Sequence, residues 1–351
     1  MYKRQLLHLL RAQATGLIVV IVLLGTLLAV LGGSVRVRVR DPVTREVVGH
    51  AEVNKFLQRP NLDTVLKNSS WIAIMAVGAT ILIICGGIDL SIGAIYCLSA
   101  VSAGMLLSAL GPGGADAPAA WVVPLGIVVC MLVGTACGAL NGLMVVLLRV
   151  HPFIITLGTM SIYRGIAFVT TRAQPVTDYP PVFGQAFRGT IADFTWIPLL
   201  IMVAVVLAGA VFLRWTVPGR DMFAVGGNEL AARLAGVRVG RTKVLAFALA
   251  GLMGGIAAVI ALGVFGSADS STGRGYELDV IAAAVVGGAS LTGGRGSAVG
   301  ALLGTMVIAL IANGIVILGI DQNYTEIIKG AVIVIAVVLD RVSARLGGRG
   351  E

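Results

Sequence analysis

Residues 71–100 read WIAIMAVGATILIICGGIDLSIGAIYCLSA, and this stretch decides the class of fold. It holds two apolar runs with a short polar turn between them. A helix needs about 20 mostly apolar residues to cross a bilayer, and both runs reach nearly that length. The double glycine Gly86–Gly87 breaks the helix, and Asp89 and Ser91 can cap the next helix start. The stretch therefore predicts two membrane-spanning helices joined by a tight break.

Composition extends this prediction to the whole chain of 351 residues. Hydrophobic residues make up 57% and charged residues only 12%, with a mean hydropathy of +0.96. A soluble domain carries about 25% charged residues, so a water-soluble fold of this length could not hide so much apolar surface. We expect an all-α membrane protein, a polytopic helical bundle forming one transmembrane domain over residues 1–351. Its ten candidate spans are residues 14–33, 69–86, 92–110, 121–148, 153–171, 196–213, 244–264, 278–291, 298–319 and 325–340.

The spans also predict a topology. The span at 278–291 is short, so we expect a discontinuous or re-entrant helix there, buried in protein. Ten spans place both termini on one side, and the Lys and Arg residues favour a cytoplasmic N-terminus under the positive-inside rule. The basic 34–68 segment contradicts that rule. Its alternating Val35–Arg40 run predicts a short hairpin strand, and we interpret the segment as an extracytoplasmic insertion loop.

The 214–243 segment differs from its surroundings because it is long, polar and basic and lies between two clear spans. Ala231, Leu234, Ala235 and Val239 recur at helical spacing. This pattern predicts a short amphipathic helix on the cytoplasmic surface.

Several function classes lack their motifs. There is no G-x-x-x-x-G-K-[ST] phosphate loop, and no Ser/His/Asp set, HExxH or GxSxG supports an enzyme, so no catalytic residue is assigned. The four cysteines and three histidines lack metal-ligand spacing, and we expect no metal and no cofactor. The net charge of +9 fits basic cytoplasmic loops beside membrane lipid. No basic run is interleaved with aromatic residues, which argues against nucleic-acid binding.

Five polar residues in or beside apolar spans are candidates for a substrate path. An Asp at membrane depth is expensive, so Asp89 favours a discontinuous helix lining a path. A tight cytoplasmic hairpin capped by Asp89 is an equal alternative. Asparagines in spans can bond the hydroxyls of a neutral polar solute, but they can also hold helices together. The five candidates are Asn68, Asp89, Ser91, Asn141 and Asn313.

Ionisable residues within spans are few. Glu277 and Asp279 fall in the first turn of the short span, where helix capping explains them and a proton relay is the alternative. Arg164 and Lys329 lie within spans, and the sequence offers only Glu326 as an obvious carboxylate partner, for Lys329.

A faint internal repeat joins the two halves of the chain. Leu132–Thr135 reads LVGT and Leu302–Thr305 reads LLGT, and each precedes an Asn-Gly pair, at Asn141 and at Asn313. The two spans run in opposite directions in the ten-span topology. Transporters are often built from inverted repeats, and such a repeat is one interpretation of this match. The match is short, and the distance from the Gly-Thr pair to the Asn-Gly pair differs, at 7 and 9 residues, so a chance resemblance is the alternative.

Four blocks of sequence resemble the signatures of a known family. They are Gly86–Gly93 (GGIDLSIG), Asn141–Gly158 (NGLMVVLLRVHPFIITLG), Gly226–Gly236 (GGNELAARLAG) and Gly273–Gly300 (GRGYELDVIAAAVVGGASLTGGRGSAVG). Together they resemble the permease subunits of ribose/xylose/galactose-type ABC sugar importers, from about residue 65 to residue 340. Branched-chain amino-acid permeases are similar in plan but less similar in the GGIDLS and GGRGS blocks.

The resemblance implies a monosaccharide importer in the bacterial cytoplasmic membrane. Two permease chains, as a homodimer, would form the pathway, a cytoplasmic ABC ATPase subunit would drive it, and a periplasmic sugar-binding protein would deliver the solute. The ATPase would dock on a cytoplasmic coupling loop, the 214–243 segment. The family's coupling motif is carried there by Gly226, Gly227, Asn228, Glu229, Ala231, Ala232, Arg233 and Gly236.

The chain departs from the family at 34–68, where members usually have a shorter connection. This basic segment would contact an acidic binding-protein face or anionic lipid, or it is a solvated insertion. Three other functions stay open. A branched-chain amino-acid-type ABC permease would share the plan, a stand-alone secondary transporter would need paired buried ionisable residues, and a membrane anchor would have featureless spans.

Overall fold

The chain folds as a bundle of long helices, seen here in a computed structural model that describes residues 2–40, 47–111, 118–191, 194–321, 323–331, 334 and 338. Within these ranges eight helices are long and apolar enough to cross a membrane, which confirms the all-α membrane fold. They are α1 (Tyr2–Leu31), α2 (Arg59–Ile84), α3 (Ile92–Leu110), α4 (Ala119–Leu148), α5 (Pro152–Thr171), α7 (Trp196–Trp215), α10 (Val239–Phe265) and α12 (Ala298–Ile317).

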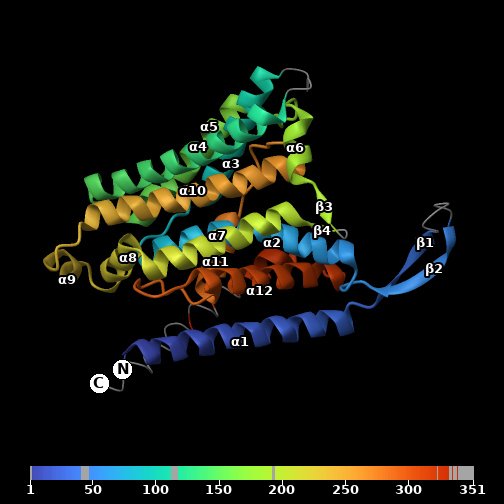
Figure 1. Ribbon diagram of the computed structural model, residues 1–351, viewed down its shortest axis with the longest axis horizontal. Coiled ribbons are helices and arrows are strands. Elements are labelled where there is room, and N and C mark those ends of the chain that lie inside the picture. The colour runs from blue at the N-terminus through green and yellow to red at the C-terminus, as the bar shows by residue number, and fades with distance from the viewer. Residues whose placement is uncertain are drawn as a thin grey trace.

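Shorter elements connect the long helices. Figure 1 shows the long helices lying side by side, with a β-hairpin projecting at one end and α8 and α9 at the other. We call these the hairpin end and the α8–α9 end. The short elements are β1 (Ser34–Arg40), β2 (Val47–Asn54), α6 (Pro181–Phe187), β3 (Thr190–Ile191), β4 (Phe194–Thr195), α8 (Val217–Gly227), α9 (Glu229–Leu234) and α11 (Tyr276–Val286).

The hairpin confirms the strand predicted at 35–40, which pairs antiparallel with β2. The expected 34–68 insertion loop is too long, however, because α2 already begins at Arg59. Pro60 stands in the first turn of that helix, where the missing proline N–H has no intrahelical acceptor to lose. The first turns of α2 are polar, so hydropathy placed the start of this span at residue 69, and the predicted span is shorter than the helix.

Two predicted spans differ from full-length helices. The span expected at 278–291 is α11, which has only 11 residues and cannot cross a bilayer by itself, as the discontinuous-helix prediction required. Residues 324–331 begin a further helix, and most of the remaining span expected at 325–340 falls outside the described residues. That tenth span stays a prediction.

The 214–243 segment is not one amphipathic helix, and that prediction is corrected. It folds as α8 and α9, followed by the first residues of α10. Asn228 separates the two short helices because its extended backbone, at φ −158° and ψ 102°, cannot continue α8. Its side-chain oxygen accepts from the Ala231 N–H at 2.9 Å and caps α9.

Two broken spans occupy the centre of the bundle. After α2 an irregular segment, 85–91, leads into α3, and after α10 a similar segment, 266–275, leads into α11. The two breaks share sequence as well as shape, since five identities recur 180 residues apart. These are Gly86 and Gly266, Asp89 and Asp269, Ser91 and Ser271, Gly93 and Gly273, and Tyr96 and Tyr276.

The two breaks meet in opposite orientations. Gly93 and Gly273 are in mutual contact, because a Cβ added to either would collide with the carbonyl oxygen of the other. Three residues after each glycine, the rings of Tyr96 and Tyr276 also pack together, with centroids 5.6 Å apart. Helix α2 packs on α11 while its counterpart α10 packs on α3, and α2 and α10 also pack on each other. This exchange of partners supports the predicted inverted repeat.

Glycines bring α4 and α10 into close contact. A Cβ on Gly138 of α4 would collide with the Phe247 carbonyl oxygen, and Gly134 and Gly251 oppose each other in the same way. Gly134 and Gly138 stand four residues apart on α4, and small residues at this spacing let two helices approach closely. Helix α10 is in this way fixed at the core, with α4 on one side and α2 on another.

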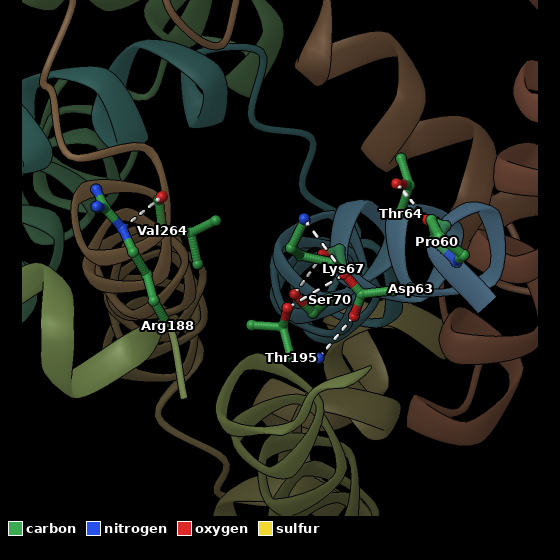
Figure 2. A network of polar contacts seen from close by, with 8 residues as sticks. All are labelled: Pro60, Asp63, Thr64, Lys67, Ser70, Arg188, Thr195 and Val264. Atoms are coloured by element: carbon green, nitrogen blue, oxygen red, sulfur yellow. Dashed lines mark hydrogen bonds and ion pairs between the residues drawn. The ribbon is translucent and has the colours of Figure 1, made fainter. Parts of the chain in front are cut away.

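A polar network at the hairpin end fixes the start of α7 to α2 (Figure 2). Asp63 accepts from the backbone N–H of Thr195 at 2.6 Å and from its hydroxyl at 3.2 Å. Lys67 lies 3.5 Å from the same carboxylate. In the same view Arg188 donates to the Val264 carbonyl at 3.1 Å, which satisfies one of the free carbonyls at the end of α10.

Candidate substrate path and coupling surface

Three of the five substrate-path candidates form one buried hydrogen-bond network. Asp89 Oδ1 accepts from the Ser91 N–H at 2.7 Å and from the Ser91 hydroxyl at 2.6 Å. Asn141 then donates from Nδ2 to Ser91 Oγ at 2.8 Å. Asp89 is only 5% exposed, and Ser91 and Asn141 are fully buried. The break after α2 is therefore tied to α4 by polar groups that face one another.

Tyr163 of α5 completes this set, which we call the Asp89 network: Asp89, Ser91, Asn141 and Tyr163. Its hydroxyl lies 3.0 Å from both Asn141 Oδ1 and the Cys137 carbonyl oxygen and donates to one of them. Sequence reasoning missed Tyr163. Its only signal was a phenol in an apolar span, and a buried phenol normally needs a partner.

The capping role expected of Ser91 is wrong, whereas the Asp89 carboxylate does accept from the backbone N–H that directly precedes α3, that of Ser91. Ser91 stands at the N-cap position of α3 but makes no side-chain cap hydrogen bond. Its hydroxyl is already engaged with Asp89 and Asn141. Asp89 Oδ2 is buried and has no hydrogen-bond partner within the described part of the chain. The bonds of the other groups favour the alternative in which polar residues hold helices together.

Asn68 and Asn313 lie elsewhere, in a cavity of about 360 Å³ between α2, α11 and α12. We call it the α2–α12 cavity. Asn61 and Asn313 exchange amide hydrogen bonds across it, of 2.7 and 3.3 Å. Asn68 lies two turns further along α2, and its amide makes no hydrogen bond to another described residue. Trp71 and Tyr276 also line the cavity.

An ion pair that the sequence did not reveal lines the same cavity. Lys329 Nζ lies 2.9 Å from Asp279 Oδ2, whereas the expected partner Glu326 lies 3.8 Å away. Both side chains are largely buried, at 19% and 12% exposure. Asp279 does fall in the first turn of α11, as expected, but its carboxylate pairs with a lysine fifty residues later.

Arg164, the other basic residue expected in a span, holds the second break to α5. Its guanidinium donates to the Ser270 carbonyl at 3.1 Å and also to the Thr272 carbonyl. The partners are backbone oxygens, which no side-chain pattern could indicate. The two breaks thus reach α5 by different chemistry, the first through the Asp89 network and the second through Arg164.

The expected coupling motif forms an exposed, charged corner at the α8–α9 end. Glu229 bonds Lys243 of α10 at 2.6 Å and Arg233 of α9 at 3.2 Å. The hydrogen bond from Lys243 holds the pKa of Glu229 below its ordinary value. Arg233 remains 66% exposed, so its guanidinium is still free to meet a partner.

The apolar residues of α9 point outward as well. Leu230 is 67% exposed and Leu234 is 81% exposed, whereas Ala232 is buried beneath them. Ala231 and Gly236 are exposed, and Gly227 has open space where a Cβ would stand. Leu230 was not among the expected motif residues, and only the fold shows that it is exposed together with Leu234.

Gly226 connects this corner to the first break. A Cβ on Gly226 would collide with the carbonyl oxygen of Ile84, the last residue of α2. The Gly294 N–H donates to that same Ile84 carbonyl at 2.9 Å. The end of α8 is therefore wedged between the C-terminus of α2 and the loop that follows α11. A movement of α8 would be passed directly to both.

No group of three or more His, Cys, Asp or Glu side chains in the part of the chain that the structure describes has the arrangement of a metal site. The four cysteines are buried free thiols.

Comparison with known proteins places this architecture among transporters. Residues 61–337 match the family model described as the branched-chain amino acid transport system / permease component. The ribose import permease protein RbsC of Bacillus subtilis is 40% identical over 289 residues, which cover 82% of this chain and 86% of that protein. RbsC of Escherichia coli K12 is 37% identical, over 81% and 87%. The galactose/methyl galactoside import permease protein MglC of the same strain is 35% identical over 293 residues, again 81% and 87%.

Proposed function

Because this chain belongs to the family of branched-chain amino acid transport system permease components, we propose that it is the membrane-spanning subunit of an ATP-driven importer for a monosaccharide. The observation that carries the proposal is the identity of 35–40% to ribose and galactose import permeases over more than four-fifths of the chain. The chain itself is a transport subunit, a multi-pass protein of the bacterial inner membrane.

The partners follow from this assignment. An ATPase subunit drives the cycle from the cytoplasmic side, a binding protein delivers the sugar from the other side, and two copies of this chain line the pathway. The α8–α9 end is the cytoplasmic side in this proposal, and the hairpin end faces the binding protein. The β1–β2 hairpin, with its Arg36–Glu52 cross-strand pair at 3.3 Å, is then an extracytoplasmic insertion.

The ATPase docks on α8 and α9 in this proposal. Three features support the assignment: the exposed side chains of Leu230 and Leu234, the exposed guanidinium of Arg233, and the wedge of Gly226 against α2. Apolar side chains supply docking area and a charged rim supplies orientation. Closure of the ATPase would push α8, and Gly226 would transmit the push to the first break and to the loop after α11.

The test is copurification with the neighbouring ATPase and binding-protein subunits, followed by uptake of labelled D-ribose, D-galactose and L-leucine. We expect Arg233→Glu to abolish ATPase assembly and uptake, because it puts a second carboxylate beside Glu229. Leu234→Ala should weaken assembly too, and it removes only exposed surface. Arg172→Glu, at the hairpin end, is the charge-matched control and should leave ATPase assembly intact. Uptake of leucine alone would favour an amino-acid permease.

One observation keeps a second function in view. A secondary transporter needs paired buried ionisable residues, and the Asp279–Lys329 pair is of that kind. The family match weighs against it, since these relatives are import permeases by name. Uptake that continues without any ATPase subunit and collapses with the proton gradient would establish the second function and refute the first.

A further inference from the structure

The Asp279–Lys329 ion pair is an expensive feature for a membrane protein. Burying two charges costs several kcal/mol per ion after relaxation, so such pairs inside a membrane mark functional sites. Here the pair lies at a cavity wall and joins α11 to the helix that begins at residue 324. One carboxylate oxygen bonds the lysine, and the carboxylate and ammonium together still have unused acceptor and donor positions.

The asparagine amides that line the same cavity also have hydrogen-bonding groups that the contacts between helices do not use. Asn61 donates to both the Phe56 carbonyl and Asn313 Oδ1, whereas Asn313 donates only to Asn61 Oδ1 among the described residues. An amide carries two donors, so Asn313 keeps one for a solute. Asn68 makes no hydrogen bond among the described residues. An asparagine that holds helices together would face a partner, as Asn141 does. Asn68 is instead exposed and lines the cavity.

Aromatic groups complete the wall. Trp71 is 3% exposed and packs edge-on against Phe265 with ring centroids 5.3 Å apart, which fixes the indole. Tyr276 is fixed in turn by Tyr96. Rigid aromatic surfaces beside a few convergent polar groups are the usual composition of a small-molecule site. Sugars offer the matching chemistry, with apolar C–H faces for the rings and hydroxyls for the amides and charges.

We propose that the α2–α12 cavity is a monosaccharide-binding station of the permease, with Asn68, Asp279 and Lys329 bonding sugar hydroxyls and Trp71 providing the apolar face. The assignment rests on the proposed function. Its volume of about 360 Å³ lies at the small end of the range for small-molecule sites, roughly 300–1,000 Å³. Asn61 and Asn313, near the hairpin-end termini of α2 and α12, lie where a solute would enter, and the ion pair lies deeper.

Cysteine protection tests occupancy directly. The full complex carries Asn68→Cys in lipid nanodiscs, and a charged maleimide measures thiol reactivity with and without D-ribose or D-galactose. The native cysteines are buried, so they give a low background. We expect a transported sugar to slow labelling of position 68 at least threefold, with mannitol having no effect. Asn323→Cys, an exposed asparagine outside the cavity, should label at the same rate throughout.

Transport kinetics test the ion pair. Losing hydrogen bonds to charged groups should raise KM for the transported sugar about tenfold in the double variant Asp279→Asn with Lys329→Met. The double change avoids leaving one buried charge unpaired, so the protein should still fold and assemble. A double variant that assembles and keeps the wild-type KM would make the ion pair structural and overturn the assignment.

The remaining outcomes separate this assignment from the proposed function. A wild-type complex that transports neither sugar refutes the proposed function and this site with it. A complex that transports sugar while the thiol of the Asn68→Cys variant stays unprotected refutes the site alone. A thiol at position 68 that reacts only after lipid is stripped away would show an acyl chain in the cavity, which also overturns the assignment.

Discussion

The Asp89 network and the α2–α12 cavity contain the same kinds of residue, an Asp at or just before the start of a helix that follows a break and asparagines from neighbouring helices. They differ in what surrounds them. Asp89 Oδ1 and the Asn141 amide bond Ser91 and Tyr163, and all four residues are buried. Asn68 and Asp279 face a cavity instead. The comparison teaches that a polar residue in a span is structural when the fold closes around it and available to solute when the fold leaves space.

Gly93→Val should have the largest effect on stability, because it separates the two breaks that position the Asp89 network and the α2–α12 cavity. The new side chain would collide with the Gly273 carbonyl oxygen, where the two breaks meet. We expect a loss of more than about 4 kcal/mol and no monodisperse protein in size-exclusion chromatography. Gly158→Val is the control, since that position has open space around it. Normal yield of Gly93→Val would show that the breaks can separate without cost.

Asn141→Leu and Asn68→Leu sharpen the comparison directly. Replacing Asn141 leaves Ser91 and Tyr163 without their amide partner inside the protein, which should cost about 2–4 kcal/mol. Replacing Asn68 removes no hydrogen bond, so stability should stay within about 0.5 kcal/mol of wild type. Thermal unfolding midpoints in detergent micelles measure both. Equal destabilisation by the two substitutions would erase the distinction between network and cavity.

The smallest effect is expected for a change of pH at the exposed Glu229–Lys243 pair. This pair serves as an exposed reference for the buried Asp279–Lys329 pair. The folded-state pKa of Glu229 is lowered, so its contribution is complete above the ordinary pKa of 4.5 and is lost only as pH falls through the lower folded value. Hydrogen exchange of residues 229–243, corrected for intrinsic rates, should therefore show constant protection from about pH 6 to about pH 8. A clear loss of protection near pH 6 would contradict this.

Much of the fold could be predicted from the sequence because lipid imposes a length and a composition on each span. The eight long helices and the short α11 follow from that constraint. The start of α2 was missed because its first turns, with Arg59 and Lys67, are polar at the hairpin end. The single helix expected at 214–243 failed because one residue, Asn228, has an extended backbone that hydropathy does not register.

The candidate sites could be predicted only in part. Polarity identified the five candidates Asn68, Asp89, Ser91, Asn141 and Asn313. It could not tell which of them belong to the Asp89 network and which line the α2–α12 cavity, because that depends on which helices pack together. The partner of Lys329 is fifty residues away, and Arg164 bonds backbone oxygens. The five recurring residues at 86–96 and 266–276 were visible in the sequence, yet their shared spacing becomes meaningful only when Gly93 meets Gly273.

The contact between Gly93 and Gly273 can form only after both residues have been synthesised, which matters for insertion into the membrane. At a synthesis rate of about 5–20 residues per second, the first break waits roughly 10–40 s in the membrane before its counterpart is made. Throughout that interval no residue from the second half of the chain is present to contact Asp89. Its partner Ser91 emerges at once, and Asn141 and Tyr163, which complete the Asp89 network, follow within 75 residues of it. The half that is made first can therefore hold one oxygen of its buried carboxylate with its own residues, and we expect it to stay inserted until the second half arrives.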